Sequence, residues 1–304
     1  MEQLRVSVQV HGRAAADENR PIPPAECLCE DENFCFPGLD KKGAVRWGRR
    51  FDCGLLGALR TARLTDEEAA RTPLDAVRID ASDRWDPVFV TATSSNHFAE
   101  LRPLIRLLHA HYPKSRIVVR RHRPGVEEAK AWCNVEVRTF HFGRYPPHVK
   151  NLRTYAFKLA IVVMHKTFFY LDTSVRHTGR HLVELLRGVQ SGHLPPFSTH
   201  TARTHHSVFA STHPGMFAYL PLPPLVSRLM EMESSVQFVS DAPYTRYVFK
   251  WWLLCAMTRE CIAPKGAQHY CRIREPKNKH RTYMKCHRFD QHTPVGNRQT
   301  HEFS

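Results

Sequence analysis

The fold is decided by the stretch Phe168-Phe169-Tyr170-Leu171-Asp172-Thr173-Ser174. An apolar, aromatic run of strand type ends there in an acidic residue that two hydroxyl residues follow. In a parallel sheet, a buried strand that ends in a carboxylate places this carboxylate at the carboxyl edge, where open α/β sheets bind ligands. The stretch therefore predicts a buried strand with Asp172 at a ligand site.

Three further strand-like runs precede this stretch, and helical patterns separate them. The strands are expected at residues 88–93, 116–119 and 135–142, and the helices at 94–111, 124–132 and 152–165. Strands that alternate with helices over short connections predict an α/β fold with a mostly parallel, doubly wound sheet. Right-handed crossovers bring the carboxyl ends of such strands to one edge, so residues 91–95 and 172–174 are expected there together.

The carboxyl-terminal part is richer in loops and prolines. We predict a helix at 180–189, a short strand at 236–239 and a helix from Asp241 or Pro243 to about Met257. Trp251 and Trp252 lie in that last helix and are expected in the core, with sugar stacking as the alternative.

The pattern divides the chain into three regions. Residues 1–85 contain cysteines but no long hydrophobic period, so we expect a stem-like amino-terminal extension. Within it, Thr65 is expected to cap a short helix, with Glu68 completing a capping box. Residues 86–291 form the ordered domain, and the polar residues 292–304 are expected to be a disordered tail.

The chain is strongly basic. It carries 44 Lys and Arg against 29 Asp and Glu, a formal net charge of +15 with the 20 histidines neutral. Such a surface attracts nucleic acid, anionic lipid, sulfated glycan or nucleotide phosphate, and charge alone does not choose among them. The basic runs at 120–123 and 277–281 lack interleaved aromatic residues, which favours a solvated face and makes nucleic acid an unexpected partner.

No apolar run approaches the roughly 18 residues that span a bilayer, and residues 1–10 lack the apolar segment of a signal peptide. Nine cysteines cluster towards both ends of the chain. They lack paired CxxC spacing, so disulfides in an oxidising compartment are favoured over a zinc site. Because nine is odd, at least one cysteine is expected to stay free or to pair between chains.

Five stretches together carry a resemblance to a known family. They are residues 88–98, 150–158, 169–176, 213–216 and 286–291. In this order they resemble the motifs of an uncharacterised animal domain family, best known from nematodes. That family is similar to nucleotide-diphospho-sugar transferases of the GT-A fold, so the resemblance implies a GT-A-like sheet and transfer of a sugar from a nucleotide-sugar donor.

The resemblance also implies roles for single residues. Asp172 and Ser174 match the metal-binding acid motif, and His287 the place of a late metal ligand; the cofactor implied is Mn²⁺ or Mg²⁺. Lys158 matches a basic residue near the nucleotide. The remaining matches are Thr91 and Thr93 near the nucleobase and ribose, and Asp290 near the acceptor hydroxyl as a base. The implied acceptor is a glycan or glycoprotein, and the implied compartment the Golgi or endoplasmic reticulum lumen, with any membrane anchor absent from this sequence.

The sequence departs from the family pattern at several places. Ser174 replaces the usual second acid, Leu159 a proline, and residues 120–125 are basic where relatives have an acid. Residues 233–235 replace a Trp-Gly-type loop, and the polar residues 293–304 stand where relatives have an apolar helix. These departures keep open an alternative, a non-catalytic protein of the same fold that binds a glycan or another anion.

Overall fold

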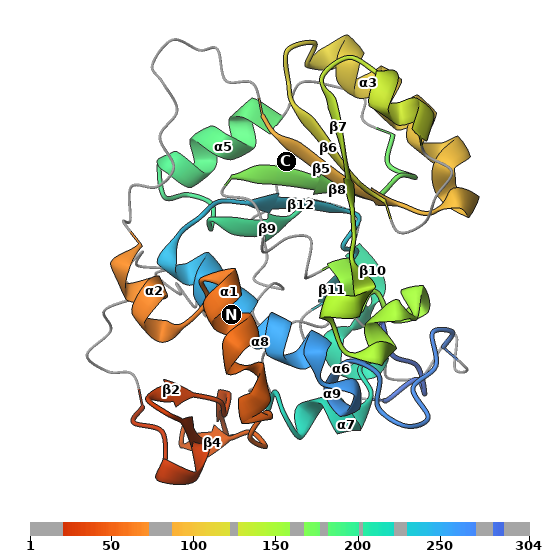
Figure 1. Cartoon of the computed structure of the whole chain (residues 1–304). Coiled ribbons are helices and arrows are strands. Elements are labelled where there is room, and N and C mark those ends of the chain that lie inside the picture. Colours follow the sequence, from red (N-terminus) through yellow and green to blue (C-terminus); the bar gives the residue numbers. More distant parts are fainter. Residues whose placement is uncertain are drawn as a thin grey trace, which may run out of the picture.

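A computed structural model describes residues 21–72, 87–121, 127–158, 167–176, 182–200, 203–221, 230–271 and 282–288. Its centre is a six-stranded sheet in the order β7-β6-β5-β8-β12-β9 (Figure 1). The strands are β5 (Phe89–Thr93), β6 (Ile117–Arg121), β7 (Val135–Thr139), β8 (Phe168–Leu171), β9 (Phe197–Thr199) and β12 (Val236–Val239).

The four strands predicted ahead of the acidic stretch and within it are neighbours. Strands β7, β6, β5 and β8 pair in parallel, which confirms the mostly parallel α/β sheet. Strand β12 lies between β8 and β9 and is antiparallel to both. Strand β9 is an addition to the prediction, because the sequence indicated only loops in this proline-rich region.

Helices cover both faces of the sheet (Figure 1). Side chains alternate between the two faces along each strand. One set, which includes Phe89 and Phe169, packs with α3 (Phe98–His111) and α5 (Leu182–Gln190). The other set, which includes Val90 and Tyr170, packs with α8 (Pro243–Met257). The sheet is therefore the middle of three layers, and we call its two sides the α3 face and the α8 face.

Two other predicted helices take different forms. The helix expected at 124–132 is a short 3-10 helix, Glu127–Ala131. The helix expected at 152–165 begins with a 3-10 turn, Leu152–Thr154, and residues 156–158 are helical. Residues 159–166 lie outside the described part of the chain, so the rest of that prediction is not tested.

The amino-terminal residues form two small hairpins and two helices. The elements are β1 (Leu28–Cys29) with β2 (Glu32–Asn33), β3 (Pro37–Leu39) with β4 (Val45–Trp47), α1 (Leu56–Ala62) and α2 (Asp66–Arg71). Disulfides join Cys27 to Cys35 and Cys29 to Cys53. The side chain of Thr65 accepts a hydrogen bond from the backbone of Glu68 at 3.3 Å, which confirms the predicted cap.

This amino-terminal segment packs against α8. The buried ammonium of Lys250 contacts the carboxylates of Glu32 and Asp66. Gly48 lets the end of the second hairpin lie close to the backbone of Tyr219, because a Cβ at position 48 would lie 2.0 Å from the carbonyl oxygen of Tyr219. Aromatic and aliphatic residues of this segment share the hydrophobic cluster of α8. The predicted boundary at residue 85 lies outside the described residues and stays a prediction, as does the tail at 292–304.

The carboxyl-terminal part adds a pair of antiparallel strands and three short helices. They are β10 (Arg203–Ser207) with β11 (Met230–Met232), α6 (Val208–Ser211), α7 (Pro214–Phe217) and α9 (Arg259–Ile262). Disulfides join Cys255 to Cys261 and Cys271 to Cys286, and Cys133 is an exposed free thiol. The prediction of disulfides with one cysteine left over is confirmed. Among the described helices, none has the length and apolarity needed to cross a membrane.

Candidate functional site

Asp172 follows β8 directly, and its carboxylate is held on both oxygens. Oδ2 lies 3.1 Å from the ammonium nitrogen of Lys158, and Oδ1 accepts a hydrogen bond from the hydroxyl of Tyr170 at 3.0 Å. The backbone N–H of Asp172 donates to the carbonyl of Ser235 at 2.9 Å, which ties the strand end to β12. The side chain keeps 31% of its surface exposed, so an oriented carboxylate faces solvent at the edge of the sheet.

Lys158 is the buried half of this ion pair, with 5% of its side chain exposed. Its ammonium also lies over two aromatic rings, 4.9 Å from the centroid of Tyr155 and 5.6 Å from that of Tyr170. A buried ammonium is costly unless an anion and aromatic faces compensate it, and Asp172 with the two tyrosines does so here. Tyr155 adopts a left-handed backbone conformation, with φ of 53°. The cluster of Lys158, Asp172, Tyr155 and Tyr170 is called the Asp172 site below.

Thr173, directly after Asp172, contacts the α3 layer. The hydroxyl of Thr173 donates to the carboxylate of Glu100 on α3 at 3.0 Å, and His97 lies 3.2 Å from the same carboxylate oxygen. Ser174 is exposed. The turn after β8 is therefore anchored to the layers on both faces, Asp172 to the α8 face and Thr173 to the α3 face.

Thr91 and Thr93 lie on the opposite face from the Asp172 carboxylate. They alternate along β5 with Val90 and Ala92, so their side chains point to the α3 face. Both are buried, and the hydroxyl of Thr93 donates to the carbonyl of Ser94 at 3.2 Å. The Thr91 hydroxyl has no hydrogen-bond partner in the described part of the chain. The structure brings their backbone to the predicted edge but does not bring their side chains to Asp172.

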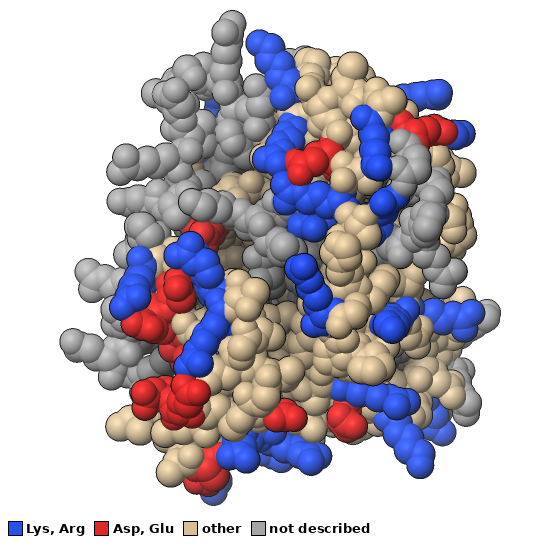
Figure 2. Space-filling model, viewed as in Figure 1, with Lys and Arg blue, Asp and Glu red and all other residues tan. Residues whose placement is uncertain are grey.

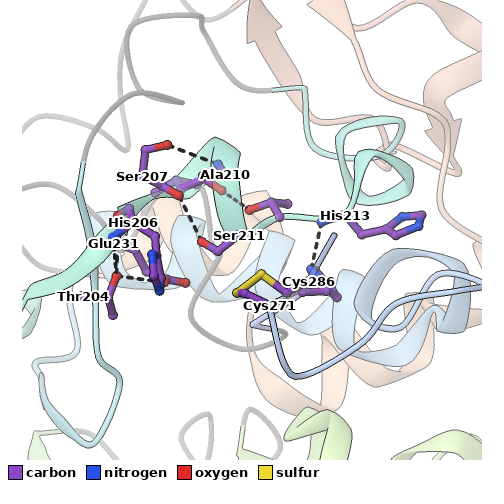
Figure 3. Close-up of a disulfide and its surroundings, with 12 residues drawn as sticks. Thr204, His206, Ser207, Ala210, Ser211, His213, Glu231, Cys271 and Cys286 are labelled. Carbon is purple, nitrogen blue, oxygen red and sulfur yellow. Dashed lines mark hydrogen bonds between the residues drawn. A yellow bond between two sulfur atoms is a disulfide. The ribbon is translucent and has the colours of Figure 1, made fainter. Parts of the chain in front are cut away.

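His287 directly follows Cys286, whose disulfide with Cys271 is drawn in Figure 3. Its Nδ1 accepts from the backbone of His213 at 3.2 Å, and its Nε2 lies 3.0 Å from the carbonyl oxygen of Ile262. Burial lowers the pKa of His287 to about 3, so the ring is neutral. Both ring nitrogens have backbone partners, so a metal ion would have to displace one of them.

The described residues alone do not fit a divalent metal ion. No group of three or more His, Cys, Asp or Glu in the described ranges is placed to hold one. The Asp172 carboxylate is already paired with Lys158, and Ser174 supplies at most a neutral oxygen. Asp290, predicted near the acceptor, lies outside the described residues. The roles assigned to these residues stay predictions.

Sequence reasoning missed Tyr170 and Tyr155 as members of the site. A signal for Tyr170 was present, because residues two apart on a strand share a face and Tyr170 precedes Asp172 by two. Tyr155 carried no such signal, since its place depends on a left-handed turn that the sequence does not announce.

Comparison with known proteins gives a family match over part of the chain. A family described as "Protein of unknown function (DUF1647)" matches residues 26–163, less than half of the sequence. The match includes the amino-terminal disulfides as well as strands β5 to β7. No curated protein matches.

Solved structures with a similar arrangement include glycosyltransferases. Galactosyltransferase LgtC, in complex with donor and acceptor sugar analogues, matches at 12% identity and a TM-score of 0.33, over 55% of this chain and 59% of its own. Glycosyltransferase GlyE of Streptococcus pneumoniae TIGR4 matches at 13% identity and a TM-score of 0.32, over 55% of this chain and 35% of its own. Core-mannan synthase A of Aspergillus fumigatus, in its Mn/GDP form, matches at 10% identity and a TM-score of 0.39, over 73% of this chain and 77% of its own. At these scores the likeness carries no argument about activity.

Proposed function

We propose that this chain is a glycosyltransferase-like protein that transfers a sugar from a nucleotide-sugar donor to an acceptor. The observation that carries the proposal is the Asp172 site itself, a carboxylate oriented by Lys158 and Tyr170 at the carboxyl edge of a mostly parallel sheet. Ligands of open α/β sheets bind at this edge. The motif resemblance of the chain supplies the class of ligand.

The chemistry asks for positive charge near the donor diphosphate, because the nucleoside diphosphate leaves with its bonding electrons. Lys158 offers an ammonium group that is fixed by Asp172 and by two tyrosine rings. A charge held in place before the reaction stabilises the leaving group without reorganisation. In this proposal Asp172 positions Lys158, and Asp290 removes the proton of the acceptor hydroxyl.

A divalent ion, Mn²⁺ or Mg²⁺, would add charge at the diphosphate when bound. Asp172 and Ser174 would hold it, but the described donor set does not complete a site. No step of the proposed reaction is therefore assigned to the ion.

The proposed acceptor is a glycan or glycoprotein, and the proposed compartment is the Golgi or endoplasmic reticulum lumen. Four disulfides among the described residues are consistent with an oxidising compartment of this kind.

A second candidate function is non-catalytic binding of a glycan or another anion on the same fold. The pairing of Asp172 with Lys158 favours it, because a carboxylate occupied by an ammonium is less available to a metal ion. The basic surface favours an anionic ligand in either case.

Thermal stability and hydrolysis measured across a panel of nucleotide sugars, with and without Mn²⁺, test the two candidates. The transferase predicts a rise in Tm and slow hydrolysis with one donor, and the loss of both in Asp172→Ala. Glu128→Gln is the matched control, because Glu128 is exposed and paired with Arg102 on the surface. Binding without hydrolysis would favour the second candidate. No ligand-dependent shift and no effect of Asp172→Ala would refute the transferase.

A further inference from the structure

One row of side chains crosses four parallel strands at the carboxyl edge. Arg138 of β7 is paired with Arg120 of β6, and Arg120 with Ala92 of β5. The register between β5 and β8 pairs Val90 with Tyr170, so two residues further along Ala92 lies opposite Asp172. The row therefore reads Arg138, Arg120, Ala92, Asp172.

All four side chains of the row belong to the α8 face. Val118 and Val90, two residues before Arg120 and Ala92, pack in the cluster of α8, and alternation carries this orientation to the row. Adjacent strands are about 4.8 Å apart, so the backbones at Arg120 and Asp172 are separated by about 10 Å. The only side chain of the row between them is the methyl group of Ala92.

The row carries more positive than negative charge. Arg120 is 5% exposed, and burial together with the nearby Arg138 lowers its pKa. Glu136 lies on the same face, but its two oxygens contact Arg138 and Arg116, which lower its pKa to about 2. Lys158 adds a third cation beside Asp172. Like charges gathered in partly buried surroundings attract an anion.

Aromatic residues border this row. Burial raises the pKa of Tyr145, and the nearby guanidinium of Arg120 opposes this rise. Tyr145 also stacks on Phe140 with 4.9 Å between ring centroids. Tyr145 and Tyr155 are partly buried against the cluster of the α8 face. In the space-filling view, Lys and Arg side chains lie over several parts of the visible face, among them the upper part where Figure 1 shows the large sheet (Figure 2).

We propose that Arg120 and Arg138 bind an anionic group of the donor, a phosphate or a carboxylate, across Ala92 from Asp172. The identity of the ligand as a donor rests on the proposed function, whereas the anion site rests on the row alone. Arginine suits this role because its planar guanidinium binds phosphate and carboxylate through two parallel hydrogen bonds. The two chemical sources are the diphosphate of the nucleotide and the carboxylate of an acidic sugar.

Isothermal titration calorimetry on the full chain tests the proposal with four probes: inorganic pyrophosphate, UDP, UDP-glucose and UDP-glucuronate. We expect Arg120→Gln and Arg138→Gln to weaken binding about 10- to 100-fold, the usual effect of losing a hydrogen bond to a charged group. Arg116→Gln is the matched control, because Arg116 also contacts Glu136 but precedes β6 at the opposite end of the strand. The affinity of the Arg116→Gln variant for each probe should stay within about twofold of the wild-type affinity.

The pattern of losses distinguishes the sources of the anion. If the arginine variants bind all four probes more weakly, the bound anion is the diphosphate. If they bind only UDP-glucuronate more weakly, it is the carboxylate of the sugar. Either outcome supports the site. Wild-type binding of every probe in both arginine variants would overturn it, and so would an equal loss in Arg116→Gln. The side chain of Arg138 is one third exposed, so Arg138→Gln still gives a result where Arg120→Gln does not fold.

The same titrations separate this proposal from the proposed function. Pyrophosphate binding that depends on Arg120, without binding of any nucleotide sugar, would contradict the proposed function and leave the anion site standing. Nucleotide-sugar binding that is lost in Asp172→Ala but unchanged in the arginine variants would support the proposed function and overturn the anion site. A wild-type chain that binds none of the probes would overturn both.

Discussion

Replacing Lys250 by methionine is expected to destabilise the chain strongly. Lys250 is fully buried in α8, and its ammonium contacts Glu32 and, at 2.8 Å, Asp66 Oδ2. Methionine fills a similar volume but removes the ammonium group that both carboxylates contact. Breaking a buried ion pair by removing one partner costs about 3–5 kcal/mol, and we expect a loss in this range near neutral pH.

The loss should depend on pH with a defined sign. Burial raises the pKa of Glu32, and Lys250 opposes that rise. A carboxyl group with a raised pKa in the folded state binds more protons there than when unfolded, so its contribution to stability falls as pH rises through the folded pKa. Without Lys250 this pKa rises further. The destabilisation of Lys250→Met should therefore be larger at about pH 8 than at about pH 5.

Urea denaturation followed by tryptophan fluorescence at the two pH values measures both effects. Lys265→Met is the control, because Lys265 is exposed. The double variant Lys250→Met/Glu32→Gln should regain part of the loss, since it removes one uncompensated charge. A loss below about 1 kcal/mol, or an equal loss at both pH values, would refute the reasoning, because it would mean that the triad is not a desolvated ion pair.

Three further predictions concern stability. Gly48→Ala should lower the free energy of unfolding by about 1–3 kcal/mol, measured by urea titration, because its Cβ would lie 2.0 Å from the Tyr219 carbonyl oxygen; Gly57→Ala, where a Cβ meets nothing within 4 Å, should show no such loss. Replacing Cys29 and Cys53 together by alanine should cost about 2–4 kcal/mol, and a Tm equal to that of the wild type under non-reducing conditions would contradict the disulfide. The pKa of His287 is lowered to about 3, so the unfolded state binds the extra proton and stability should fall as pH drops below about 6.5. His287→Gln should flatten that part of a Tm-versus-pH curve, and an unchanged slope would exclude His287 as its source.

Much of the sheet could be predicted from local pattern. The β-branched and aromatic runs at β5, β6 and β8 are apolar on both sides because helices cover both faces, and a continuous apolar run is the mark of such strands. Strand β9 could not be predicted in this way. It is three residues long, follows two prolines, and forms by pairing with β12, a contact between segments far apart in the sequence.

The amino-terminal segment has contacts that local spacing does not predict, and its status as a separate region stays a prediction. Its short elements carry no long hydrophobic period, so the sequence indicated a stem-like extension. In the structure, residues 21–72 contain two disulfides and pack against α8. Cysteine pairing and the approach of Glu32 to Lys250 depend on three-dimensional placement, which local spacing does not encode.

The sequence by itself determined the order along the chain of the four strands that pair in parallel, the position of Asp172 at the end of a buried strand, and the basic character of the chain. These features follow from residue composition and from the spacing of apolar residues, which recur every two residues in a strand and about every 3.6 residues in a helix. Both are local properties of the sequence. Only the tertiary structure decided which charges meet. It joined Lys158 to Asp172, turned Thr91 and Thr93 to the opposite face, and set Arg120 and Arg138 in one row with Asp172. The physical reason is that the register of paired strands, and not the spacing along the chain, determines which side chains are neighbours.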